Sequence, residues 1–399
     1  NDVILEGPIS LQGRKMLKTW VKRYFKLTPS SFQIFKNKTS PSPKKYFSLL
    51  LISEISFAPE CKEQPAFKIV FDGKTKFFVP EDAQIATEII GFIERNRIRP
   101  SEDYLNISMY DMSTEIWKTN NCLILLAKHK VDNSMYVIKR YSKFNLDNKN
   151  VNIEEYTKEF LTFMNPFVST LKYVPSSQGD IFLIYEYVEK GILFGKLLKD
   201  QIFNESTAAF YASEILLGLS YLHQHKGAFG KLAPNSILIS NDGHIKIADP
   251  GLSIGINEYN EYTAPELISQ IKELNSSATI VIPKPETDFY SFGLIIYYMI
   301  CGMPPFFDDD KKKQDELILE NHIRFPRHVS QDAKELIKAL MNKDPSKRLT
   351  DFETIKSYKF FQNINWNLIL SKAISPPWKP EPEYKCQNMI EAEKNILVV

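Results

Sequence analysis

Hydrophobic residues in the first 80 positions occur in short runs that are separated by turn residues. Residues 20–27 and 31–35 are rich in aromatic and β-branched side chains and are joined by a Thr-Pro-Ser turn, which is the pattern of a β-hairpin. Residues 66–71 and 75–79 lie on either side of an Asp-Gly pair, a strong short-range signal for a tight hairpin turn. The first part of the chain is therefore predicted to form antiparallel strands.

The spacing of apolar residues changes after these strands. Within residues 81–97, apolar side chains recur three and four positions apart, which places them on one face of a helix. They are Ile85, Ile89, Phe92 and Ile93. A small antiparallel sheet that ends in one helix forms a single domain, which we place at residues 4–98. Residues 99–111 are polar, contain a proline, and are predicted to be a linker.

The rest of the chain combines strands and helices in a different order. Residues 123–127 and 136–139 are predicted strands around a polar turn, 181–187 is a predicted buried strand, and 152–163 is a predicted helix. A longer helix is predicted to begin after Asn204, a favourable N-cap residue. Strands followed by long helices favour a bilobal α+β domain.

Composition adds limits to this picture. With 43% hydrophobic and 25% charged residues, the 399-residue chain has enough apolar material for a core, which argues against disorder. The longest nearly apolar run, residues 289–301, has 13 positions, whereas a transmembrane helix needs about 20. The first residues carry no signal-peptide pattern. We therefore expect a soluble protein.

The cysteines point to a reducing environment. The four of them lie far apart and form no Cys-x-x-Cys pair. They are Cys61, Cys122, Cys301 and Cys386. This spacing fits neither a disulfide framework nor a zinc cluster. The expected location is the cytoplasm.

Charge is distributed unevenly along the chain. The total is near balance, with 50 Lys and Arg against 48 Asp and Glu, but the first 100 residues hold 17 basic and only 10 acidic residues. Residues 11–45 contain ten basic residues and no acidic one. A solvated basic face is one interpretation of this block. The other is a surface for polyanions, either lipid headgroups or nucleic acid.

The beginning of the chain resembles a known lipid-binding domain. The segment Leu5-Glu6-Gly7, followed by Lys18-Thr19-Trp20 and Arg23-Tyr24-Phe25, resembles the first hairpin of the pleckstrin-homology (PH) domain of protein kinase B (Akt). The resemblance implies a PH-type β-barrel or sandwich with a C-terminal helix.

In that family, basic residues of the first hairpin hold inositol phosphates. The resemblance makes the lipid-binding candidates Arg14, Lys15, Lys18 and Arg23. The first basic residue of the family's Arg-x-Arg pair is replaced by Val21, and a further family lysine falls on Leu11 or Gln12. Each basic residue near an anionic membrane contributes about 1 kcal/mol. We therefore expect attraction to acidic membrane lipid, including phosphoinositides, and peripheral recruitment to the plasma membrane.

Eight short motifs follow one another in the second part of the chain. They are Val137-Ile138-Lys139, Asn165-Pro166-Phe167, Tyr221-Leu222-His223, residues 229–239, Asp249-Pro250-Gly251, Ala264-Pro265-Glu266, residues 288–293 and residues 343–349. In this order and spacing they resemble the motif set of a eukaryotic protein kinase. The resemblance implies a bilobal protein-kinase-like domain, which we place at residues 112–361.

Three later stretches narrow the resemblance. Residues 315–319, 323–326 and 375–380 are similar to the AGC group of kinases and within it to Akt. Residues 362–399 then correspond to an AGC-type C-terminal tail, which here is truncated and lacks the hydrophobic motif Phe-x-x-Phe.

The glycine-rich loop of a kinase is missing. Kinases use Gly-x-Gly-x-x-Gly because only glycine lets the backbone N–H groups approach the phosphates of ATP closely. Counted back from Lys139, the three glycine positions hold Trp117, Thr119 and Cys122. The phosphate cradle is therefore not expected to form in the usual way.

Two residues that bind nucleotide and metal in the family are present. Lys139 takes the place of the lysine that pairs with the phosphates, and Asp249 takes the place of the magnesium ligand. A strand lysine is more often simply solvated, and Asp-Pro-Gly is also an ordinary turn sequence. The position of the lysine's usual helix partner holds Tyr156, with Glu155 one residue away, and Val137 narrows the adenine site. Binding of ATP and Mg²⁺ is therefore left open.

The catalytic loop lacks the side chains that carry out phosphate transfer in the family. Residues 229–236 align with the family's loop, and they place Lys231 where the catalytic base Asp stands. A carboxylate acceptor is thus replaced by a cationic donor, and a general base is worth about 10²–10⁴ in rate. The phosphate-side lysine is Ala233, and the metal-binding asparagine is Ser236. The loop arginine is Gly230.

Residues that support the fold are present by the same comparison. Glu266 and Arg348 resemble the buried ion pair of the large lobe, and Asp288 resembles the residue that supports the catalytic-loop backbone. Tyr259 stands at the substrate-side threonine position, and Ile192 replaces a glutamate that binds ribose and basic substrates. This combination is typical of a pseudokinase, which keeps the fold and loses the chemistry.

We therefore predict a membrane-recruited signalling scaffold or regulator with a PH domain and a pseudokinase domain, which binds a protein partner through the kinase-like domain. The alternative is a weakly active serine/threonine kinase that uses Lys139, Asp249 and an unusual base. A nucleic-acid-binding module is less favoured, because no aromatic stacking platform is interleaved with the basic residues. No nucleic-acid partner is expected.

Overall fold

A computed structural model of the chain describes residues 3–13, 19–97, 102–118, 122–147, 165–188, 202–248, 259–274, 281–320 and 322–380. The chain divides into two compact units. The first comprises residues 1–103 together with the short segments 164–166 and 365–375, and the second comprises residues 104–163, 167–364 and 376–399.

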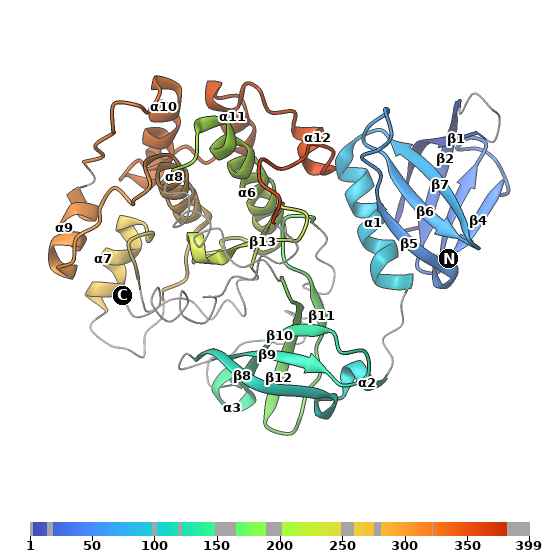
Figure 1. Cartoon of the computed structure of the whole chain (residues 1–399), viewed down its shortest axis with the longest axis horizontal. Coiled ribbons are helices and arrows are strands. Elements are labelled where there is room, and N and C mark those ends of the chain that lie inside the picture. The colour runs from blue at the N-terminus through green and yellow to red at the C-terminus, as the bar shows by residue number, and fades with distance from the viewer. Residues whose placement is uncertain are drawn as a thin grey trace. The chain divides into compact units, whose positions relative to one another are not determined.

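The first unit is built on a seven-stranded antiparallel sheet in the order β4-β3-β2-β1-β7-β6-β5 (Figure 1). The strands are β1 (Leu5–Gln12), β2 (Trp20–Thr28), β3 (Ser31–Phe35), β4 (Lys45–Ser48), β5 (Ile52–Phe57), β6 (Phe67–Phe71) and β7 (Lys74–Pro80). A short 3₁₀ helix, η1 (Leu49–Leu51), precedes β5, and α1 (Ala83–Arg97) follows β7.

Both predicted hairpins of this unit are confirmed. Strand β2 pairs with β3 so that Thr28 lies opposite Ser31, and β6 pairs with β7 so that Phe71 lies opposite Lys74. In the second turn Asp72 and Gly73 have positive φ angles of 50° and 66°. Two positive φ angles define the turn type whose twist matches that of the flanking strands.

The predicted helix over residues 81–97 is also confirmed. Its start is capped by Asp82, whose carboxylate accepts a hydrogen bond from the backbone N–H of Ile85 at 2.8 Å. The helix α1 buries Ile89 and Ile93 in a core that it shares with the sheet. The centre of this core is aromatic: Phe67 and Phe78 are fully buried, and their rings stack with centroids 5.2 Å apart.

The second unit begins with a five-stranded antiparallel sheet in the order β11-β12-β10-β9-β8. Its strands are β8 (Tyr110–Lys118), β9 (Leu123–His129), β10 (Met135–Ser142), β11 (Leu171–Tyr173) and β12 (Asp180–Glu186). The predicted strands at 123–127, 136–139 and 181–187 are thereby confirmed. The predicted helix at 152–163 lies outside the described residues.

A helical part follows this sheet (Figure 1). Its elements are α6 (Glu205–Lys226), η3 (Pro234–Ser236), α7 (Pro265–Glu273), α8 (Pro285–Cys301), α9 (Lys311–Glu320), α10 (Gln331–Leu340), η4 (Pro345–Lys347), α11 (Phe352–Lys356) and η5 (Lys359–Phe361), with a small hairpin of β13 (Ile237–Ile239) and β14 (Ile245–Ile247). The described part also contains α3 (Lys143–Asp147) after β10, and α12 (Trp366–Leu370), which belongs to the first unit.

Two features of this helical part follow directly from the sequence. Asn204 caps α6 as predicted, because its side chain accepts a hydrogen bond from the N–H of Thr207 at 2.8 Å. The apolar run at 289–301 lies in α8, which is buried on every side from Thr287 to Ile300. A helix that is apolar all round is one that the rest of the domain surrounds. Among the described residues, no helix has the length and apolar character needed to cross a membrane.

The segment that was predicted to be a linker contains ordered elements. Within residues 99–111 the structure has α2 (Glu102–Leu105), η2 (Ile107–Met109) and the first residues of β8. Tyr104 and Tyr110 hold these elements on the sheet, since the ring of each stacks or packs against His129. The linker was predicted from the polar composition of residues 99–111. Two tyrosines change that composition little, although their contacts order the segment.

The tail after α12 passes close to the turn of the β13–β14 hairpin. Gly243 in this turn has a φ of +89°, and a Cβ placed on it would lie 2.2 Å from the carbonyl oxygen of Trp378. No side chain fits in that gap. The glycine therefore allows the main chain at 376–378 to lie directly on the hairpin.

At the level of fold class, the prediction is confirmed: a sheet-rich N-terminal region precedes a kinase-like domain of mixed α and β content. The finer assignment of the first region to the PH type remains a prediction.

Candidate functional site

Four side chains share one face of the five-stranded sheet at the candidate nucleotide site. Val137 on β10 lies opposite Tyr185 on β12, and Lys139 lies opposite Leu183. Because alternate residues of a strand point to the same face, these four side chains line one surface. The Lys139 ammonium nitrogen lies 5.5 Å from the centroid of the Tyr185 ring, within the range of a cation–π interaction.

Tyr185 was not singled out by the sequence analysis. Only 3% of this residue is exposed. A large aromatic ring here and the branched Val137 across from it leave less room beside Lys139 than small side chains would. In the sequence, Tyr185 is simply one aromatic residue of the apolar run at 181–187. Its place beside Lys139 becomes clear only from the pairing of β12 with β10.

The backbone of the catalytic-loop segment is held by one buried carboxylate. Asp288 on α8 is 1% exposed, and its two oxygens accept hydrogen bonds from the N–H groups of Phe229 and Gly230 at 2.6 and 2.7 Å. The ring nitrogen Nε2 of His223 lies 2.9 Å from the same carboxylate. These hydrogen bonds offset the free-energy cost of burying the carboxylate. Because two of them go to backbone N–H groups of the loop, Asp288 holds the loop in place.

The two loop positions that carry metal and phosphate chemistry in kinases are occupied otherwise. The hydroxyl of Ser236 donates to the carbonyl of Ala233 at 2.8 Å and accepts from its N–H at 3.1 Å. Its side chain therefore closes a local turn. Lys231, in the base position, is exposed. The backbone of the loop is held in place. Its described residues lack the side chains that bind a metal ion and activate a nucleophile in kinases.

Gly230 has a structural reason to be glycine. Its φ is +77°, and a Cβ on it would come within 2.4 Å of Cγ of Pro283. Both the left-handed backbone and the close proline exclude a larger residue. The arginine that the family has here is therefore incompatible with this loop and with the segment that leads into α8.

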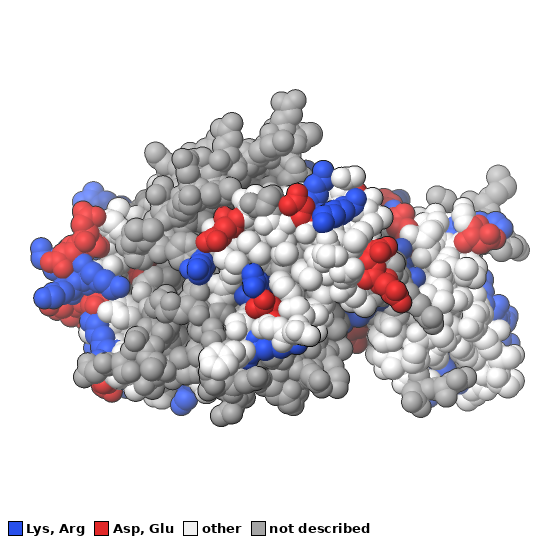
Figure 2. All heavy atoms as spheres, turned by 90° about the horizontal axis from the view of Figure 1, so that it is seen from below, with Lys and Arg blue, Asp and Glu red and all other residues white. Residues whose placement is uncertain are grey.

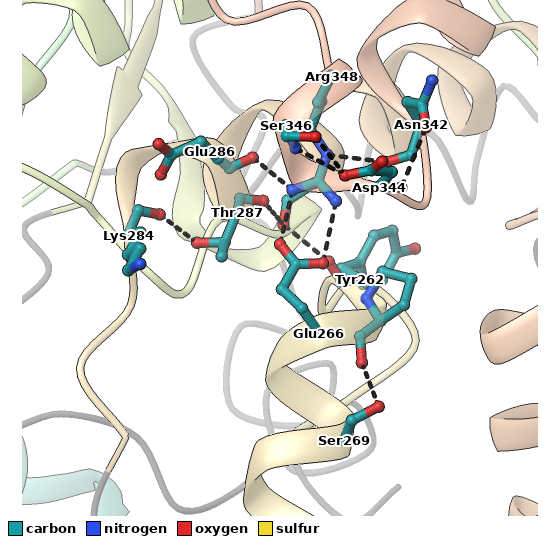
Figure 3. Close-up of polar contacts among 12 residues, drawn as sticks. Tyr262, Glu266, Ser269, Lys284, Glu286, Thr287, Asn342, Asp344, Ser346 and Arg348 are labelled. Carbon is teal, nitrogen blue, oxygen red and sulfur yellow. Dashed lines mark hydrogen bonds and ion pairs between the residues drawn. The ribbon is translucent and has the colours of Figure 1, made fainter.

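A buried ion pair joins α7 to the segment before α11 (Figure 3). The guanidinium of Arg348 donates to both oxygens of Glu266, at 2.6 and 2.9 Å. It also donates to the carbonyls of Glu286 and Asn342 at 2.8 and 3.0 Å, and it lies 5.1 Å from the centroid of the Tyr290 ring. The Arg348 side chain is 0% exposed. The acceptors of its hydrogen bonds all belong to the same domain.

Tyr259, at the substrate-side position, is engaged with α9. Its hydroxyl donates to Asp315 at 2.9 Å, Lys272 forms an ion pair with the same carboxylate at 2.6 Å, and the Lys311 ammonium lies 4.7 Å from the tyrosine ring centroid. Burial, followed by the bond and charge of Asp315, raises the pKa of Tyr259 to about 12.

Tyr259, Lys311 and Asp315 border a hollow of about 200 Å³, which Phe307 also lines. Figure 2 shows acidic and basic side chains intermixed at the end of the second unit that carries α9. The hollow itself is mainly acidic, because Glu261, Asp308, Asp309 and Asp315 line it against the single basic residue Lys311. Neither the ion pair nor the position of Lys311 was foreseen from the sequence.

A second ion pair connects the last strand of the sheet to the small hairpin. The Lys246 ammonium donates to the carboxylate of Glu186, which also accepts from the N–H of Thr170 at 3.1 Å. Burial alone would raise the pKa of Glu186, but the charges of Lys246 and Lys172 lower it below its ordinary value. This pair ties β12 to β14 beside the candidate nucleotide site.

Several predicted site residues lie outside the described part of the chain. They are Arg14, Lys15, Lys18, Tyr156, Ile192 and Asp249. Of the lipid-binding candidates only Arg23 is described, and its guanidinium donates to the carbonyl of Lys22 at 2.8 Å. Within the described residues, no group of three or more His, Cys, Asp or Glu side chains could hold a metal ion.

The fold and the site together define the class of protein. A five-stranded antiparallel sheet with a strand lysine precedes a helical part, in which a buried aspartate holds the catalytic-loop segment and a buried Glu–Arg pair braces α7. This is the arrangement of a protein-kinase-like domain.

Comparison with known proteins identifies the family. Residues 113–361 match the protein kinase domain, and the chain belongs to this family. It is 28% identical to a RAC family serine/threonine-protein kinase homolog of Dictyostelium discoideum, over 94% of this chain and 87% of that protein. Identity to the RAC-beta serine/threonine-protein kinase A of Xenopus laevis is also 28%, over 95% of this chain and 88% of that protein.

The identity is higher over a shorter stretch. The human RAC-beta serine/threonine-protein kinase is 34% identical over 54% of this chain and 46% of its own length. The chain is therefore a kinase-domain protein of the AGC type with RAC/Akt-like relatives.

Proposed function

We propose that this chain is a pseudokinase: an Akt-like protein that keeps the kinase fold, does not transfer phosphate, and acts as a membrane-recruited scaffold or regulator. One observation carries the proposal. The catalytic-loop segment is held by Asp288 at 2.6 and 2.7 Å, yet the residue that this loop presents in the base position is Lys231. A correctly held loop with a cation at its centre cannot accept the proton of an attacking hydroxyl.

The residues present do not fit ATP and Mg²⁺ as catalytic cofactors. The Ser236 hydroxyl is bonded within its own turn, the glycine positions hold Trp117, Thr119 and Cys122, and the ring of Tyr185 lies under the Lys139 ammonium. Lys139 and Asp249 are the residues that would contact a bound nucleotide and its metal. We propose that any such binding is weak and serves no chemistry.

The first unit is the proposed membrane-binding part. An antiparallel sheet with one C-terminal helix agrees with a PH-type domain over residues 4–98, and the 17 basic residues among the first 100 favour acidic lipid. We propose a cytoplasmic protein that binds acidic phospholipid, including phosphoinositides, through this unit. The kinase-like domain is the proposed surface for a protein partner.

A phosphate-transfer assay tests the proposal directly. The purified chain is incubated with 1 mM ATP·Mg²⁺ and a basic serine peptide, beside its Lys139→Ala variant and, as a positive control, the human RAC-beta serine/threonine-protein kinase. We expect the wild-type chain and the variant to give the same background incorporation of phosphate. Incorporation above that of Lys139→Ala would overturn the pseudokinase proposal and favour the alternative of a weakly active serine/threonine kinase.

Thermal unfolding with and without the nucleotide adds an independent measurement. A site with a Kd near 10 μM would stabilise the chain by about 2.7 kcal/mol at 1 mM ATP·Mg²⁺, which corresponds to roughly 5 °C or more. We expect no shift of this size. A shift that Lys139→Ala and Asp249→Ala both abolish would contradict the proposal of weak binding, without by itself restoring catalysis.

A further inference from the structure

Tyr104 is one of the two tyrosines that anchor the segment leading into the kinase-like domain. Tyr104 on α2 stacks on the ring of His129 at a centroid distance of 4.3 Å and an angle of 12°. On β11, Tyr173 stacks with it as well, at 5.0 Å and 24°. Figure 1 shows α2 beside the five-stranded sheet of the second unit. Tyr104 is also the first residue of that unit.

The hydroxyl end of Tyr104 is bound as closely as its ring. It donates to the carboxylate of Asp132 at 2.7 Å. The other oxygen of Asp132 accepts from the N–H of Ser134 at 2.9 Å and lies 3.1 Å from Nδ1 of His129. Asp132 therefore joins the tyrosine to the turn between β9 and β10.

Two further hydrogen bonds hold residues 104–110 on this turn, and a third lies within the segment itself. The N–H of Lys130 donates to the carbonyl of Met109 at 2.9 Å, and the Lys130 ammonium donates to the carbonyl of Ser108 at 2.6 Å. Tyr110 donates through its hydroxyl to the carbonyl of Tyr104 at 3.0 Å. Residues 104–110 and the 129–134 turn thus form one contact, which we call the linker latch.

The end of the linker latch that contains α2 and η2 can open at a low cost in free energy. Neither α2 nor η2 contains a buried residue, and Glu102, Asp103 and Leu105 around the tyrosine are exposed. Segments with few buried contacts open locally at a small fraction of the global unfolding free energy. Tyr104 can therefore reach solvent without unfolding of the sheet.

We propose that Tyr104 is a phosphorylation site for a protein-tyrosine kinase, and that the phosphate keeps the linker latch open. In the reaction the Tyr104 oxygen attacks the γ-phosphorus of ATP, so that a P–O bond to the tyrosine forms and the bond from γ-phosphorus to the bridging oxygen of ADP breaks. ADP leaves, and the hydroxyl proton passes to the base of the tyrosine kinase and then to solvent.

The charge at the latch explains why the modified tyrosine does not return. Burial raises the pKa of Asp132, but the hydrogen bonds from Tyr104, Ser134 and His129 outweigh this and lower it to about 2, so the carboxylate is ionised at neutral pH. A phosphotyrosine carries about −1.5 to −2 charges and is repelled by a neighbouring carboxylate.

Opening of the latch lengthens the connection between the two units. The six residues before β8, 104–109, change from a bound to an extended conformation, while Tyr110 stays in the sheet. Extended chain spans at most ~3.3–3.6 Å per residue, so these six residues can then span up to about 20 Å in all. This inference does not depend on whether the kinase-like domain is catalytically active.

The test uses the full chain, phosphorylated by a purified tyrosine kinase with ATP·Mg²⁺ and mapped by mass spectrometry. Tyr104→Phe is compared with Tyr46→Phe, which removes a tyrosine that is 53% exposed on the other unit. Backbone hydrogen exchange is then measured in peptides that cover 104–111 and 129–134. We expect phosphorylation at Tyr104, and exchange in both peptides at least tenfold faster than in the unmodified chain.

The control variants separate this effect from phosphorylation elsewhere. Treated Tyr46→Phe should open as the wild type does. Treated Tyr104→Phe should keep exchange within about threefold of the untreated variant. The proposal is overturned if the kinase modifies Tyr46 but leaves Tyr104 unmodified. It is equally overturned if Tyr104 carries phosphate and exchange in both peptides is unchanged.

Discussion

At the residue scale, this chain differs from an active kinase in a few side chains that stand in well-formed surroundings. Lys231 lies in a loop whose backbone is held by Asp288. Gly230 lies where Pro283 leaves no room for a Cβ. Tyr185 is packed under Lys139. Because each substitution is accommodated by its neighbours, reversal of a single residue does not recover the site.

The buried Glu266–Arg348 pair gives a stability prediction at this scale. Removal of one partner from a buried ion pair typically costs about 3–5 kcal/mol, because the other charge is left without compensation. We expect Arg348→Ala to lower the free energy of unfolding by this amount and the melting temperature by roughly 6 °C or more, as measured by calorimetry.

The neighbouring lysine provides the matched control. Lys347 is 73% exposed, and its ion pair with Asp344 has a distance of 3.3 Å. Exposed pairs contribute little, so Lys347→Ala should change the stability by less than about 0.5 kcal/mol. Equal losses for the two variants would show that the Arg348 network has no special role.

At the element scale, the turn between β9 and β10 has a pH dependence that follows from Asp132. Its pKa is about 2 in the folded chain, against an ordinary value of 3.8. The folded state binds this proton less readily than the unfolded state, so the stabilisation is fully present above about pH 4 and is lost as the pH falls toward 2.

Asp132→Asn tests this dependence, because the amide does not titrate. We expect the wild type to be more stable than the variant at pH 6, and the difference in melting temperature to shrink as the pH is lowered from 4 to 2.5. A difference that stays constant across this range would contradict the assignment of the low pKa to Asp132.

At the scale of the whole molecule, charge separates the two units. The first 100 residues carry a net positive charge and the remainder a net negative one. Each basic residue near an anionic membrane contributes about 1 kcal/mol. Joint replacement of Arg14, Lys15 and Lys18 by Gln should therefore weaken binding of the full chain to phosphatidylserine-containing vesicles about 100-fold, as measured by cosedimentation.

A second triple variant controls for loss of charge alone. Replacement of Lys311, Lys312 and Lys313 on α9 removes the same charge from exposed positions of the other unit. This variant should bind the vesicles as the wild type does, and higher salt should weaken both. Equal weakening by the two triple variants would contradict a lipid site in the first unit.

The sequence by itself determined the elements and the order of the motifs. The hairpins at 20–35 and 66–79 follow from local chemistry, because turn residues and β-branched runs act within a few positions. Asn204 and the helix that it caps are equally local. The replacement of the catalytic base by Lys231 is visible once the motif order sets the register.

Only the tertiary structure decided which residues meet. The pairing of β10 with β12 brings Tyr185 under Lys139, and the approach of Pro283 explains Gly230. Folding back of residues 104–110 turns an expected linker into a latch at Asp132. Each of these contacts depends on strand register or on chain segments far apart in sequence, and a slip of one residue in register would move Tyr185 to the opposite face. Local pattern carries no information on such pairings.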